Sequence, residues 1–176
     1  MRTQLAAAVA AVSLAVTIAL APPGAAETVS KADPNPRCSQ AAPLDVKRAT
    51  FTYSERAFKT KMRMGDLSKK RTQVFARFFV RQGGQTTYEV FLVSAFRRGE
   101  LRTVGRWSDY TGEGDGGRIN RGLAGSWDFQ EDTVTFRLTN RLRGQRIDAA
   151  AYSVEKGADH GPPCGDYIFT RALRRG

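Results

Sequence analysis

The segment AFKTKMRM, residues 57–64, shows most clearly how this chain folds. Its even positions carry Phe58, Thr60, Met62 and Met64, and basic side chains occupy the odd positions from Lys59 onward. A period of two residues predicts a β-strand with one buried face and one basic face in solvent. The decisive signal for the fold is therefore alternation.

The same alternation continues on both sides of this segment. Residues 72–81 and 86–96 carry apolar side chains on both faces, which predicts two central strands, and residues 122–129 and 133–138 read as a hairpin. Further strands are expected at residues 49–53, 100–107, 146–154 and 166–173. About eight short strands without a long helical period predict an all-β protein, an antiparallel, jelly-roll-like β-sandwich.

The N-terminus has the pattern of an export signal. Arg2 precedes an apolar run from Leu5 to Ala21, and small residues follow it up to Ala26. We expect residues 1–26 to be a signal peptide, residues 27–44 a flexible lead-in and residues 45–176 the β-sandwich domain. No later segment has the length of a transmembrane helix, so we expect a secreted protein, either extracellular or at the cell envelope.

The chain is strongly basic, with a formal net charge of +11, and most of its 28 basic residues are arginine. Such a charge attracts anionic polymers through salt-sensitive binding. A GC-rich genome would enrich arginine codons without any ligand, and this compositional explanation of the charge is the favoured one. A cell-wall glycan or another anionic polymer is the expected partner, and nucleic acid is the least favoured one.

The two cysteines, Cys38 and Cys164, precede the first and the last predicted strand of the domain. Outside the cytoplasm they are expected to form a disulfide. Closing a loop on the order of 100 residues stabilises a fold by about 5 kcal/mol in the chain-entropy model. A metal site around Cys164 and His160 is disfavoured, because the spacing matches no zinc pattern.

The loop at residues 108–118 concentrates acidic side chains and glycines. Asp109, Glu113 and Asp115 could supply hard oxygen ligands for calcium. Their spacing does not match an EF-hand, and a solvated hairpin loop explains the same residues. No other cofactor is expected.

Aromatic side chains flank this loop. Trp107 and Tyr110 are candidates for a sugar-binding platform at the rim of the sandwich, whereas Trp127 alternates with apolar residues and is expected in the core. In the strand at residues 72–81, Phe75 and Phe79 alternate with arginines on one face, which suits an anionic chain. A central strand whose second face is covered explains that pattern too.

Three segments resemble a group of small secreted actinobacterial proteins of unknown function: LDVKRATFTYSERAFKTKMRMGDL (44–67), RGLAGSWDFQEDTVTFRL (121–138) and CGDYIF (164–169). The outline is also similar to DOMON-like and carbohydrate-binding-module-like sandwiches. The resemblance implies a jelly-roll-type sandwich and, at most, a role in binding a glycan or a small ligand. Arg121 and Arg141 stand where this group often has cysteines, so a second disulfide is not expected.

The sequence therefore favours a non-catalytic binding or structural module at the cell envelope. No acidic pair stands out by its spacing, so no catalytic residue is predicted. The alternatives are a hydrolase of envelope polymers, which would need convergent carboxylates in a cleft, and an electrostatic binder of extracellular nucleic acid or anionic lipid.

Overall fold

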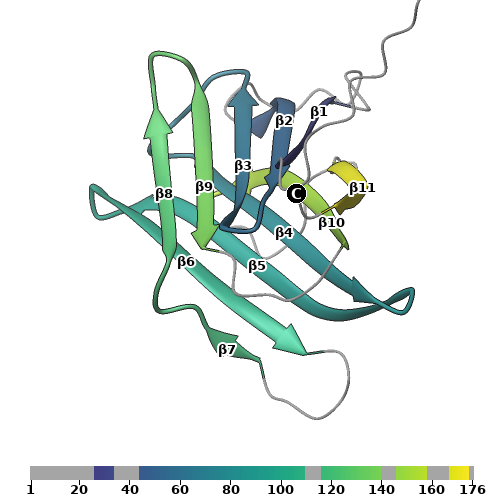
Figure 1. Ribbon diagram of the computed structural model, residues 1–176. Coiled ribbons are helices and arrows are strands. Elements are labelled where there is room, and N and C mark those ends of the chain that lie inside the picture. The colour runs from purple at the N-terminus through teal and green to yellow at the C-terminus, as the bar shows by residue number, and fades with distance from the viewer. Residues whose placement is uncertain (1–25, 34–43, 110–115, 140–145, 158–166, 175–176) are drawn as a thin grey trace, which may run out of the picture.

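The computed structural model describes residues 26–33, 44–109, 116–139, 146–157 and 167–174. Within these residues the chain consists almost entirely of β-strands (Figure 1). Among them, no helix is long and apolar enough to cross a membrane. The strands are β1 (Glu27–Ala32), β2 (Val46–Tyr53), β3 (Ala57–Met64), β4 (Thr72–Gln82), β5 (Gln85–Arg97), β6 (Glu100–Asp109), β7 (Gly117–Arg118), β8 (Leu123–Asp128), β9 (Thr133–Thr139), β10 (Arg146–Glu155) and β11 (Ile168–Arg174).

The strands form two antiparallel sheets. The five-stranded sheet has the order β1-β2-β3-β9-β8, and the six-stranded sheet has the order β11-β10-β4-β5-β6-β7. In Figure 1 the strands of one sheet cross those of the other at a clear angle. The predicted antiparallel β-sandwich is confirmed, as are the central positions of β4 and β5 and the hairpin of β8 with β9.

The core lies between the two sheets and follows from the alternation in the sequence. In β3, Phe58, Thr60, Met62 and Met64 are buried, and the basic side chains between them are exposed. The apolar faces of β4, β5 and β10 in the other sheet pack against this face, and together with the inner faces of β2 and β9 they form one continuous cluster. Burying these side chains is the main favourable contribution to folding.

Close contacts join the sheets at both lateral edges. Near β8 and β6, an added Cβ at Gly125 would lie only 2.1 Å from the hydroxyl oxygen of Thr103, so the backbones approach closely only because Gly125 has no side chain. At the opposite edge, the backbone N–H of Arg174 in β11 donates to the carboxylate of Glu27 in β1.

The outer face of the six-stranded sheet carries a second, smaller apolar cluster. The ring of Phe75 stacks on that of Tyr152, with centroids 4.7 Å apart, and Val154 is buried beside them. Arg77 binds Glu89, with 2.5 Å between the arginine Nε and a carboxylate oxygen, and its guanidinium lies over the ring of Phe79. In β4, arginines alternate with aromatic side chains on the outer face. These contacts agree with the explanation that β4 is a central strand whose second face is covered.

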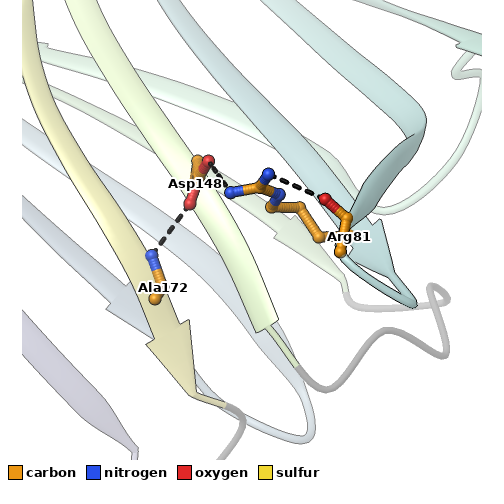
Figure 2. A network of polar contacts seen from close by, with 4 residues as sticks. Arg81, Asp148 and Ala172 are labelled. Atoms are coloured by element: carbon orange, nitrogen blue, oxygen red, sulfur yellow. Dashed lines mark hydrogen bonds and ion pairs between the residues drawn. The ribbon is translucent and has the colours of Figure 1, made fainter.

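A β-bulge distorts the ladder between β10 and β11, and a polar network compensates for it (Figure 2). The bulge places Ala172 in a left-handed conformation, with φ of 55°. Its backbone N–H donates to Asp148 Oδ1 at 2.8 Å, and Asp148 Oδ2 lies 3.4 Å from Arg81. Arg81 also donates to the carbonyl oxygen of Gly84 at 2.8 Å.

Two elements differ from the sequence prediction. Residues 27–32, expected in the flexible lead-in, form the edge strand β1, because their backbone pairs with β2 and the Thr28 hydroxyl lies 3.1 Å from that of Thr52. Part of the predicted loop at residues 108–118 also belongs to the sheet, as the end of β6 and the two-residue strand β7. The predicted signal peptide, Cys38, Cys164 and His160 lie outside the described residues, apart from Ala26 at the end of the signal.

Candidate binding site

A pocket of about 590 Å³ lies beside β5, β6, β7 and β9. Its lining combines two aromatic side chains, three aliphatic ones and a polar edge. The lining residues are Tyr88, Val90, Trp107, Arg118, Ile119, Asn120, Arg121, Leu138 and Thr139.

Trp107 is the largest side chain of the pocket. It is half-buried, because it lies on the inner face of β6 and packs against the main core. Gly117 of β7 pairs with it, and a Cβ at that position would lie 2.8 Å from the indole Nε1. A glycine is therefore required where the chain crosses the indole ring.

The segment from Arg118 to Gly122 forms one wall of the pocket. The N–H of Ile119 donates to the carbonyl of Gly105 at 2.9 Å, and the N–H of Thr139 donates to the carbonyl of Gly122 at 2.7 Å. These bonds attach the segment to β6 of one sheet and to β9 of the other. The wall is therefore held at both ends by backbone hydrogen bonds.

The polar part of the pocket is cationic. Arg118, Asn120 and Arg121 are exposed, and neither arginine forms an ion pair with any residue that the structure describes. The described lining residues include no carboxylate, histidine or cysteine. An indole face beside an amide and two guanidinium groups can bind an apolar ring face together with hydroxyl or anionic groups.

The structure describes only some of the site residues that the sequence predicts. Trp107 lines the pocket wall instead of forming a flat exposed platform, and its predicted partner Tyr110 lies outside the described residues. Trp127 packs against the core as expected, and its indole N–H donates to the hydroxyl of Ser94 at 2.9 Å.

The predicted calcium ligands are not assembled in the described part of the chain. Asp109 is at the end of β6, whereas Glu113 and Asp115 lie outside the described residues. Within the described ranges, no group of three His, Cys, Asp or Glu side chains could hold a metal ion. Calcium binding by this loop stays a prediction, which a calorimetric titration with calcium tests.

Sequence reasoning missed Tyr88, Asn120 and Arg121. Tyr88 precedes the pocket wall by about thirty residues and reaches it only through the pairing of β5 with β6. A usable signal was the polar segment RINR, residues 118–121, directly after the glycines of the loop.

Fold and pocket together define an antiparallel β-sandwich protein with a partly aromatic, cationic pocket. No protein-family model matches the chain, and no curated protein sequence matches it.

Proposed function

We propose that this protein is exported and acts at the cell envelope as a non-catalytic binding module for a glycan or another cell-wall polymer. The observation that carries the proposal is the pocket, in which the indole of Trp107 stands beside the polar side chains of Asn120 and Arg121. Binding sites for small ligands are typically concave and largely apolar, with a few polar groups that fix orientation.

The chemistry of the pocket suits a sugar ring. The C–H groups on one face of a pyranose pack on an indole, and the amide of Asn120 can both donate to and accept from hydroxyl groups. The guanidinium groups of Arg118 and Arg121 would add bidentate hydrogen bonds to a carboxylate or phosphate substituent. The pocket therefore favours an acidic or phosphorylated glycan over a neutral one.

Retention of the purified protein on insoluble peptidoglycan, measured over a series of salt concentrations, tests the proposal. We expect retention that persists at high salt and that falls in Trp107→Leu and in Asn120→Ala. Asn120 is exposed, so its substitution leaves the core intact. Phe169→Ala is the matched control, because Phe169 is an exposed aromatic, 39% accessible, on β11 and outside the pocket.

Two results would contradict the proposal. One is retention that disappears with salt alone and is unchanged in both pocket variants, since this is the behaviour of non-specific electrostatic binding. The other is release of soluble fragments from peptidoglycan by the wild-type protein, since this would identify a hydrolase of envelope polymers.

A further inference from the structure

A second concave surface lies on the outer face of the six-stranded sheet, over β5, β6 and β7. This groove has a volume of about 1070 Å³. Its floor contains Phe91, Val93 and Val104, and Val104 is 58% exposed although it is apolar. A contiguous apolar surface that is bordered by polar residues is one of the features that mark ligand-binding grooves.

Arginines border this floor at both ends. Arg106 of β6 and Arg118 of β7 face each other directly across the ladder at one end, and Arg97, Arg98 and Arg102 lie at the other. Arg102 and Arg106 are four residues apart on one strand, which corresponds to about 13 Å. The two arginine clusters are thus separated by an aliphatic strip.

Most of these arginines have no carboxylate partner. Glu100 pairs with Arg102 at 2.5 Å, but Arg97, Arg98, Arg106 and Arg118 form no ion pair within the described ranges. Like charges directly opposite each other on paired strands destabilise a sheet. The Arg106–Arg118 pair therefore lowers stability unless an anion binds between the two guanidinium groups.

The same face of the same sheet provides an internal comparison. Arg77 and Arg81 of β4 are each paired with a largely buried carboxylate, from Glu89 and Asp148. These two arginines, which stabilise the folded sheet, are therefore each paired with an acidic residue of the same sheet. Among the groove residues that the structure describes, there is one acid, Glu100, for five arginines.

The turn between β5 and β6 agrees with this interpretation. Arg98 has a φ of 52°, in the left-handed region that non-glycine residues adopt at a cost. Asparagine or glycine would fit this turn position better, so an arginine here costs some stability.

We propose that the groove binds a linear polymer of polyol units linked by phosphodiesters, with phosphates held by the two arginine clusters and the polyol on the aliphatic strip. Guanidinium groups bind phosphate oxygens in a bidentate manner. The exposed floor is mainly aliphatic, whereas single-stranded nucleic acid is held by exposed aromatic platforms. This inference rests on the proposed function, because it names the polymer class for an envelope-binding protein. The groove adjoins the pocket and shares Arg118, Ile119 and Asn120 with it, but its floor and the other arginines lie outside the pocket.

Poly(glycerol phosphate) is the probe that tests the groove, with binding measured by calorimetry over a salt series. We expect Arg102→Gln/Arg106→Gln to weaken binding about tenfold or more and to reduce its salt dependence, because two charged contacts are lost. Both positions are exposed and lie outside the pocket that contains Trp107, so the variant should fold normally. Circular dichroism and thermal unfolding check the fold.

Arg63→Gln/Arg137→Gln is the matched control. It removes the same charge from exposed positions on β3 and β9 of the other sheet. An equal loss of binding in the control would overturn the inference, because the overall charge would then be sufficient. Binding of single-stranded DNA or polyglutamate of the same charge as tightly as poly(glycerol phosphate) would overturn it as well.

The two proposals fail in different ways. If poly(glycerol phosphate) does not bind but Trp107→Leu still abolishes retention on peptidoglycan, the groove inference is wrong and the proposed function stands. If the polymer binds through Arg102 and Arg106 while retention is independent of Trp107, the pocket is not the glycan site and the groove is the ligand site.

Discussion

Replacement of Asp148 by alanine tests whether its carboxylate holds the bulged edge of the six-stranded sheet. Asp148 is 8% exposed and accepts the backbone N–H of Ala172, which the bulge has removed from the regular ladder. It also pairs with Arg81, which is partly exposed (Figure 2). The substitution therefore leaves one backbone donor and one guanidinium without this carboxylate.

The expected loss of stability follows from these contacts. A hydrogen bond to a charged acceptor contributes about 1.5–3 kcal/mol. The partly exposed ion pair at 3.4 Å adds about 1 kcal/mol or less because solvent screens it. We therefore expect Asp148→Ala to reduce the free energy of unfolding by about 2–4 kcal/mol. Asp148→Asn keeps an oxygen acceptor for Ala172 and should cost about half as much.

Chemical denaturation followed by far-ultraviolet circular dichroism measures these changes, and an unchanged m-value shows that the unfolding transition is comparable. A double-mutant cycle with Arg81→Ala separates the ion pair from the hydrogen bond to Ala172. If Asp148→Ala cost less than about 1 kcal/mol, the carboxylate would not hold the bulge, and the account of this edge would be wrong.

Three further substitutions test other parts of the structure. Thr60 is fully buried and its hydroxyl finds no hydrogen-bond partner among the described residues, so Thr60→Val should raise the free energy of unfolding by about 1 kcal/mol in denaturation. Gly125→Ala should lower it by about 1–3 kcal/mol, because the new methyl group would collide with Thr103; an unchanged midpoint would show that the sheets can separate at this edge. Burial raises the pKa of Tyr152 to about 12, whereas a tyrosine in the unfolded chain ionises near pH 10. The contribution of the neutral Tyr152 phenol to the free energy of unfolding is therefore complete below about pH 10 and is lost towards about pH 12. This loss, up to about 3 kcal/mol, should be absent from Tyr152→Phe.

The alternation of side chains predicted most of the sandwich because burial itself has a period of two in a strand. It failed at β1, where Val29 is the only sizeable apolar side chain and the strand depends on pairing with β2. It also failed at β7, because two residues are too few to show a period. Both missed strands lie at sheet edges, where partner backbones provide much of the stabilisation.

The candidate sites were less accessible to sequence reasoning than the fold. Trp107 could be singled out as an aromatic side chain beside a glycine-rich loop, but the pocket also needs Tyr88 and Leu138, which only the strand pairing brings near it. The groove could not be predicted from the sequence for a similar reason, which concerns charge. Its arginines are visible in the sequence, but which of them have an acidic partner in the described part of the chain depends on the register of the strands.

Cross-strand register determines which arginines of this protein lie near an acidic residue and which lie opposite another arginine. A genome-wide preference for arginine would place arginines on any exposed strand position, without regard to the residue opposite. In the six-stranded sheet, Arg77 has Glu89 as a partner on the adjacent strand, whereas Arg106 faces Arg118. A compositional bias would account for the number of arginines, but not for the position along this groove of arginines that form no ion pair with a described residue. Removal of two charges from the groove and of two from the opposite sheet distinguishes these explanations, because only a ligand-binding groove makes the position of the charge matter.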